Sequence, residues 1–358
     1  MKNIFFTPGP TQLYPTVARH LQKAIKEDIA SISHRGEKFH EIYDDTQNAL
    51  RKLLKIPKDF QIFLLSSGTE AMERIIENTV GESSLHLVGG EFSKRFYETA
   101  NFLHKKAEKV EVAPGLGFDF GQIDIGRQVE LVCFTHNETS TGVALPMNEI
   151  YGIKKRFPDK LIALDTVSSS PYVDVDFGYV DLCFFSVQKG FGLPAGLGIV
   201  IVSPTAMKIN ESLERKNYMV GTYHSFGELL KYSEKFETPE TPNVLAIYLL
   251  GKVAQDMLKI GIQKIRKNTK EKADLLYNFF EKQEGFRPFV KEKKYRSNTV
   301  IVVETDNDSS VFIEKLKKRG LVVGNGYKDF KNKQLRIANF PAHSTTDVKR
   351  LIREIKNI

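Results

Sequence analysis

Six short apolar runs alternate with stretches of helical spacing over the first two thirds of the chain, and this alternation constrains the fold most. Successive apolar residues, rather than every second one, are typical of strands buried on both faces of a parallel sheet. Between the runs, the spacing of apolar residues predicts helices at 37–54, 69–80 and 148–157. The pattern predicts an α/β domain in which helices cover both faces of a mainly parallel sheet. The expected strands are 61–65, 85–88, 131–135, 161–164, 182–187 and 197–202.

The last third of the chain has a different pattern. Residues 218–242 are rich in Gly, Thr, Glu and Pro and predict a loop that leaves the sheet, and a long helix at 244–284, bent near Gly261, should follow. Beyond it, two helices and three short strands indicate a small α+β domain. We therefore expect an N-terminal arm (1–15), a large domain (16–255) and a small C-terminal domain (256–358). The expected elements of the small domain are strands at 299–304, 321–323 and 335–338, a helix at 309–319 and a last helix from 345.

Composition excludes several classes of protein. The 358 residues are 41% hydrophobic and 27% charged, as in an ordinary soluble protein, and no apolar stretch is long enough to cross a bilayer. The net charge of +8 comes largely from lysines and arginines mixed with acidic residues in the last hundred or so positions, so we expect solvated helix faces rather than a nucleic-acid site. Cys133 and Cys183 both lie in apolar runs, which argues against a disulfide framework or a metal cluster. Pro and Gly interrupt the first ten residues before a signal-peptide core, so a cytoplasmic location is the default.

Lys189 lies at an unusual position for a lysine, between an apolar run and a glycine-rich segment. It ends the apolar run 182–187 and precedes a glycine-rich loop at 190–198. Lysine is rarely buried without a partner, so a lysine delivered by a strand into such a turn is a candidate for covalent chemistry with an aldehyde. A lysine that extends to solvent from the end of a strand is the ordinary alternative.

Other polar residues also follow the predicted strands, whose carboxyl ends should meet at one edge of the sheet. Ser67, Gly68 and Thr69 open a helix, where free N–H groups and hydroxyls can bind a phosphate ester, although ordinary helix capping would use the same residues. Asp165 ends another strand and could pair with a protonated pyridine nitrogen, or could simply cap a turn. Thr139 and Phe92 could respectively bind a ring oxygen and stack on a ring.

These motifs, taken in order along essentially the whole chain, resemble the class V, fold-type I pyridoxal-phosphate enzymes, which implies a seven-stranded, mainly parallel sheet and an aminotransferase activity. Three further segments are most similar to phosphoserine aminotransferases and alanine or serine:glyoxylate aminotransferases. They are 7–11 (Thr-Pro-Gly-Pro-Thr), 32–39 (Ile-Ser-His-Arg-Gly-Glu-Lys-Phe) and 335–339 (Leu-Arg-Ile-Ala-Asn).

The resemblance implies a role for each candidate. Lys189 would form the Schiff base with pyridoxal 5′-phosphate, Asp165 would pair with the pyridine nitrogen, and Arg336 would bind the substrate α-carboxylate. Thr241 would reach the cofactor phosphate of a neighbouring subunit, and His34 and Arg35 would reach a substrate phosphate there, so a homodimer with shared active sites is implied. The remaining implied cofactor ligands are Ser67, Gly68, Thr69 and Gln188 at the phosphate, Thr139 at the phenolic oxygen and Phe92 on the ring face.

The resemblance leaves the substrate open between phosphoserine, with 2-oxoglutarate or glutamate as partner, and alanine or serine with glyoxylate or pyruvate. Phosphoserine enzymes carry an arginine where this chain has Thr69, and a His-Arg pair where it has Asp329 and Phe330. A class V lyase and a cofactor-bound regulator without turnover are further alternatives. Cysteine desulfurases need a mobile reactive cysteine, and no cysteine follows Cys183.

Overall fold

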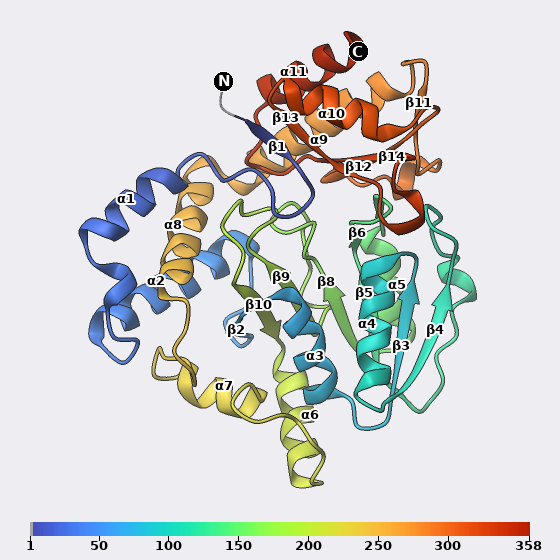
Figure 1. The fold of residues 1–358 in the computed structure, drawn as a ribbon. Coiled ribbons are helices and arrows are strands. Elements are labelled where there is room, and N and C mark those ends of the chain that lie inside the picture. Colours follow the sequence, from blue (N-terminus) through green and yellow to red (C-terminus); the bar gives the residue numbers. More distant parts are fainter. Residues whose placement is uncertain (1–2) are drawn as a thin grey trace.

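The computed structural model describes residues 3–358 and contains one large and one small sheet (Figure 1). The large sheet has seven strands, and all neighbouring pairs are parallel except those that β10 makes with β2 and β9. In spatial order its strands are β2 (Gln61–Leu65), β10 (Gly198–Val202), β9 (Leu182–Ser186), β8 (Leu161–Asp165), β5 (Val129–Thr135), β3 (Ser83–Val88) and β4 (Lys106–Glu111). The predicted mainly parallel sheet is therefore confirmed.

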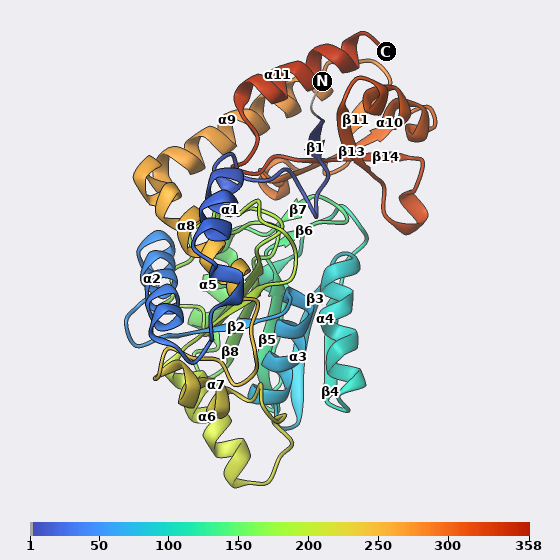
Figure 2. The same cartoon turned by 60° about the vertical axis from the view of Figure 1, so that its left-hand side comes forward.

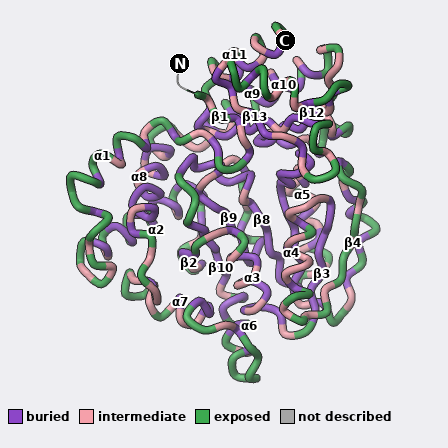
Figure 3. Tube along the Cα trace, in the orientation of Figure 1, coloured by how far each residue is buried: buried purple, intermediate pink, exposed green. Residues whose placement is uncertain are grey.

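Side chains alternate between the two faces of this sheet, and each face is covered by its own helices. Leu164 and Phe185 point into one apolar core with α2, α5 and α8, whereas Ala163 and Phe184 point into the other with α3, α4, α6 and α7. All strands of this sheet except the edge strand β4 are almost wholly buried as a result (Figure 3). The covering helices are α2 (Glu37–Leu54), α3 (Gly68–Thr79), α4 (Glu91–Phe102), α5 (Met147–Arg156), α6 (Pro204–Arg215), α7 (Phe226–Ser233) and α8 (Val244–Ile260).

The small sheet joins both ends of the chain (Figure 2). Its order is β1 (Ile4–Phe6), β13 (Leu321–Asn325), β14 (Gln334–Ala338), β12 (Val300–Thr305) and β11 (Phe286–Pro288). Phe6 is fully buried in the same core as α9 (Ile262–Phe280) and α11 (Thr345–Lys356). The predicted N-terminal arm thus includes a strand, and residues 7–10 then lead from the small sheet to the large one.

Several elements differ from the sequence prediction. The segment 218–242 is not entirely loop, because Ser225 caps the short helix α7 within it. The single long helix is two helices, α8 and α9, since Gly261 at φ +89° ends the first, and the second ends at Phe280. Strand β4 escaped prediction because it carries alternating charged residues at the sheet edge. The pattern also left out α1 (Val17–Lys26), α4 and α6.

The other predicted small-domain elements match to within two residues, including α10 (Ser309–Lys318), whereas strand β11 was not predicted. After β5, the short strands β6 (Asn137–Glu138) and β7 (Val143–Ala144) pair with each other as a separate antiparallel two-stranded sheet. Across residues 3–358 none of the helices has the length and apolar character required to cross a membrane.

Candidate active site

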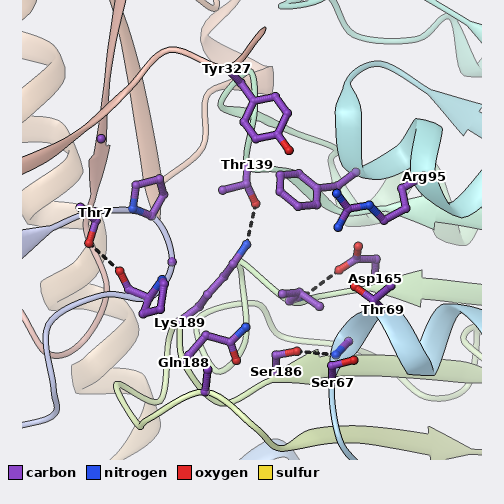
Figure 4. A pocket seen from close by; sticks show the side chains of 18 of the residues that line it. Thr7, Ser67, Thr69, Arg95, Thr139, Asp165, Ser186, Gln188, Lys189 and Tyr327 are labelled. Atoms are coloured by element: carbon purple, nitrogen blue, oxygen red, sulfur yellow. Dashed lines mark hydrogen bonds between the residues drawn. The ribbon is translucent and has the colours of Figure 1, made fainter. Parts of the chain in front are cut away.

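A pocket of about 430 Å³ lies between the two sheets, at the carboxyl ends of the parallel strands (Figure 4). Nine of the predicted site residues line it, and the structure adds several that the sequence did not single out. The predicted residues are Ser67, Gly68, Thr69, Phe92, Thr139, Asp165, Gln188 and Lys189, joined by Arg336 from β14. The additional ones include Thr7, Gly9, Met72, Arg95, Val167, Ser186 and Tyr327.

Lys189 is buried at the centre of the pocket. Its Nζ donates a hydrogen bond to Thr139 Oγ1 at 3.0 Å and lies 4.9 Å from the centroid of the Phe92 ring. Burial lowers the pKa of the amine, and the negative charge of Asp165 only partly opposes this effect. Gly9, at φ +147°, makes room for the lysine stem, because a Cβ there would lie 2.9 Å from Lys189 Cε. The lysine is thus held with its amine in reach of a ligand and shifted toward the neutral, nucleophilic form.

Asp165 ends β8 and is 3% exposed. Its Oδ1 accepts a hydrogen bond from the Val167 N–H at 2.8 Å, while Oδ2 accepts none from the described residues. Burial raises the pKa of this carboxyl group, and the positive charge of Lys189 counters part of the rise. A buried carboxylate with a free oxygen is suited to a cationic N–H donor supplied by a ligand.

The turn at the start of α3 combines a helix cap with free donors. Ser67 Oγ accepts from Glu70 N at 3.0 Å, and the Gly68 N–H donates to Ser186 Oγ at 2.6 Å. The ordinary capping alternative therefore describes Ser67 correctly. Neither the backbone N–H nor the hydroxyl of Thr69 has a partner within residues 3–358, so these donors are available to an anion at the helix N-terminus. Ser186, at the end of β9, escaped sequence reasoning although it fixes this turn.

Thr139 connects the lysine to Arg336. Its hydroxyl accepts from Lys189, and its carbonyl oxygen accepts from Arg336 Nη1 at 3.4 Å. The Arg336 Nε donates to the Asn325 carbonyl at 2.7 Å, and the guanidinium lies 5.2 Å from the Tyr327 ring centroid. These contacts leave Nη2 free to donate to a carboxylate in the pocket.

Glu138 fixes the position of Phe92. The buried carboxylate accepts from the N–H groups of Phe92 and Ser93 and from the Ser93 hydroxyl, at 2.9–3.3 Å. Gly90 permits this approach, since a Cβ there would lie 2.4 Å from Glu138 Cγ. The carboxylate thereby satisfies N–H groups at the start of α4 and orients the Phe92 ring. The sequence offers one indication that Glu138 belongs to the site, which is that it directly precedes Thr139.

Three predicted site residues lie outside the pocket of a single chain. The Arg35 guanidinium donates to Glu237 Oε2 at 2.6 Å and to the carbonyl of Thr238 at 2.8 Å. Thr241 lines a separate cavity with His224, and His34 is absent from both cavities. The roles given to His34, Arg35 and Thr241 require a second subunit and stay predictions.

Arg95 and Tyr327 line the pocket but were not predicted, although each lies close in sequence to a residue that was considered for the site. Arg95 lies three residues after Phe92 on α4, so both face the pocket, and its guanidinium is 5.3 Å from the Phe92 ring centroid. Tyr327 precedes Lys328 and Asp329, and its ring lies 5.9 Å from that of Phe92. Asp329, which the sequence placed near a substrate phosphate, is exposed and does not line the pocket.

Comparison with known proteins identifies the family of this chain. A model of the family described as aminotransferase class-V matches residues 4–351. A crystal structure of a phosphoserine aminotransferase from Cytophaga hutchinsonii is 44% identical, has a TM-score of 0.98, and covers 99% of this chain and 98% of its own. A curated phosphoserine aminotransferase from Rhodococcus opacus is 28% identical over 98% of this chain and 93% of its own length. An alanine–glyoxylate aminotransferase from Nostoc, 22% identical with a TM-score of 0.85, shares the fold over 100% and 95% of the two chains.

The pocket also fits the cofactor of this family. It offers an amine shifted toward neutrality, a buried carboxylate with a free oxygen, an aromatic ring face and free donors at a helix N-terminus. These are the groups that an aldehyde, a pyridine nitrogen, an aromatic ring and a phosphate respectively require. The chain therefore belongs to the class-V aminotransferases, which are fold-type I, pyridoxal-phosphate-dependent transferases.

Proposed function

We propose that this enzyme transfers the amino group between phosphoserine and 2-oxoglutarate, with glutamate as the second amino acid, in the cytoplasmic synthesis of serine. The observation that carries the proposal is the 44% identity, over nearly the full length of both chains, to a protein described as a phosphoserine aminotransferase. The pocket supports it with Arg336 as a carboxylate ligand beside a buried lysine and aspartate.

Each pocket residue then has a binding role toward the cofactor. Lys189 would hold it covalently at the aldehyde, Asp165 at the pyridine nitrogen, Thr139 at the phenolic oxygen and Phe92 on the ring face. The phosphate would lie against Gly68, Thr69 and Gln188, with Ser67 shaping the turn. Gln188 supports this role because its amide, which lines the pocket, forms no hydrogen bond within residues 3–358.

When bound, pyridoxal phosphate supplies an aldehyde and a ring that stabilises negative charge at the substrate α-carbon. Asp165 keeps a proton on the ring nitrogen by presenting its free carboxylate oxygen to it. Lys189 would hold and move the proton that leaves the substrate α-carbon, a task that its lowered pKa favours. Arg336 holds the α-carboxylate in both half-reactions, so that phosphoserine leaves as its keto acid and 2-oxoglutarate leaves as glutamate.

The active enzyme in this proposal is a homodimer. Support comes from Thr241, which lies outside its own chain's pocket on a loop held by Arg35 and Glu237. From that loop it would reach the partner's cofactor phosphate, while His34 and Arg35 would face the partner's substrate.

Transamination between a small neutral amino acid and glyoxylate or pyruvate is the second candidate. Thr69 and Phe330 favour it, because neither offers a cation where the phosphoserine enzymes carry one. A class V lyase remains a third reading of the same pocket chemistry.

A half-reaction distinguishes these candidates. Purified enzyme loaded with pyridoxal phosphate is mixed with phosphoserine, glutamate, alanine or serine, and conversion of the bound cofactor to its amine form is followed in the visible spectrum. We expect the fastest conversion with phosphoserine and glutamate. Faster conversion with alanine or serine would support the neutral-substrate candidate. Consumption of an amino acid while the cofactor stays in its aldehyde form would indicate a lyase.

A further inference from the structure

Arg95 is a cation in the active-site pocket whose guanidinium has no acidic partner. Its guanidinium forms no hydrogen bond or ion pair within residues 3–358 and contacts only the Phe92 ring. The two carboxylates on the same helix are engaged elsewhere, since Glu91 pairs with Lys328 at 2.5 Å and Glu98 with Lys94 at 3.8 Å. A half-buried guanidinium that lacks a carboxylate is available to an anion from solution.

The position of Arg95 separates it from Arg336. Each guanidinium lies against a different aromatic ring: Arg336 is 5.2 Å from the Tyr327 centroid and Arg95 is 5.3 Å from the Phe92 centroid, and the two rings are 5.9 Å apart. Arg336 comes from β14 and Arg95 from α4, so the two cations reach the pocket from different elements, and Figure 4 shows the Arg95 side chain extending from α4 into the pocket. Two separated cations suit a ligand with two separated anions.

We infer that Arg95 binds the second, distal anionic group of the substrates, so that the pocket selects amino and keto acids with a phosphate or carboxylate at the far end of a short chain. This inference rests on the proposed function, and it identifies the substrate class by charge. The positive charge of Arg95 is also close enough to Lys189 to contribute to the lowered pKa of that amine.

Other charged groups near the pocket are less suited to this role. Arg35 is already bonded to Glu237 and to the carbonyls of Thr238 and Pro239 within its own chain. Lys328 is paired with Glu91. Arg95 is therefore the pocket cation best placed to receive the distal anion without first breaking an ion pair.

Two unreactive ligands test the inference. Glutarate and pentanoate have the same chain length and one carboxylate for Arg336, but only glutarate has a second carboxylate. We expect the holoenzyme to bind glutarate about ten- to a hundredfold more tightly by calorimetry, as for a hydrogen bond between charged groups. Arg95→Gln should bring this ratio close to one, and Arg95→Lys should give an intermediate value because the ammonium lacks the planar pair of donors.

Lys94→Gln is the matched control, since it removes the same charge from the adjacent, exposed position of α4 and should keep the ratio. An unchanged ratio in Arg95→Gln, or a wild-type ratio near one, would overturn the inference, as would a collapse of the ratio in Arg35→Gln instead. Weaker binding of pyridoxal phosphate by the Arg95→Gln apoenzyme, with the ratio retained, would assign Arg95 to the cofactor. None of these outcomes affects the wild-type half-reaction, whose failure would refute the proposed function separately.

Discussion

Two polar regions of the molecule differ in how their charges are paired. In the pocket, Asp165 and Arg336 each keep a polar atom that has no partner among residues 3–358. Lys189 donates to a neutral hydroxyl and forms no ion pair there, and the guanidinium of Arg95 has no hydrogen-bond partner. In the second region, which we call the loop clamp (Arg35, Glu70, His224, Glu237 and Glu240), each charged side chain pairs with an opposite charge. Unpaired buried charge costs stability unless a ligand compensates it, whereas paired charge can stabilise a loop. Pocket variants should therefore impair chemistry, and clamp variants should impair stability.

The largest contrast should come from two buried lysines. Lys189→Met should reduce the half-reaction with an amino acid about 10³-fold or more, because it removes both the covalent link and the proton carrier. Lys272→Met should instead lower the melting temperature, because Lys272 Nζ donates to the carbonyls of Phe340 and His343 at 3.1 and 2.7 Å. Spectral conversion and thermal denaturation of both variants measure the difference. A large loss of stability in Lys189→Met, with activity retained, would reverse the comparison.

Asp165→Asn should reduce turnover about 10²-fold, since an amide cannot hold the proton on the ring nitrogen. The negative charge of Asp165 raises the pKa of Lys189, so its removal should lower that pKa further. The neutral amine, which attacks the aldehyde, then appears at lower pH. Absorbance of the bound cofactor measured across a pH series should show covalent capture shifted to lower pH. Activity within a few-fold of the wild type and an unshifted profile would make Asp165 a structural residue only.

Arg336→Lys should raise the apparent KM for amino and keto acids alike by about tenfold, because an ammonium cannot reproduce the two parallel hydrogen bonds of a guanidinium. The spectrum of the bound cofactor should not change. Steady-state kinetics with both substrates measure the effect. A rise in KM for only one of the two would mean that the half-reactions use different carboxylate ligands.

His224→Gln should have the smallest effect, and it should act on stability. Burial alone would lower the pKa of His224, but hydrogen bonds to Glu240 and Glu70 raise it to about 9. Because the folded pKa exceeds the ordinary value of about 6.5, the charged pair stabilises the fold fully below pH 6.5 and loses this contribution as the pH rises through about 9. We expect a melting temperature lower by roughly 3 °C at pH 6 and little change at pH 10. Equal losses at both values would show that the imidazole matters through packing alone.

The sequence predicted the large sheet and the centre of the site because both depend on local patterns. Apolar runs identified six of its seven strands, and residues at their ends, including Lys189 and Asp165, do converge in one pocket. Strand β4 lacked such a run because it is an edge strand whose alternate side chains face solvent. Its existence depends on pairing with β3, which only the folded chain provides.

Residues that act through distant contacts were harder to predict. Glu138 is a carboxylate at the end of the two-residue strand β6, and its role follows only from the approach of α4, which brings the Phe92 N–H to it. Tyr327 and Arg95 come from different domains and meet only across the pocket. The homodimer, the domain limits and the roles of His34, Arg35 and Thr241 remain predictions.

The first strand of the chain has a consequence for how the enzyme is made. Ile4–Phe6 pairs in parallel with residues 321–323, and the same N-terminal segment continues through Gly9 to the wall beside Lys189. Residues 4–6 must therefore wait until residues 321–323 have left the ribosome before the two strands can pair. Such long-range pairing is slow to form, and the large sheet can assemble well before it. A nascent chain released only as far as about residue 300 would thus carry the lysine but not the closed wall around it, so the pocket can be completed only after residues 321–323 have emerged.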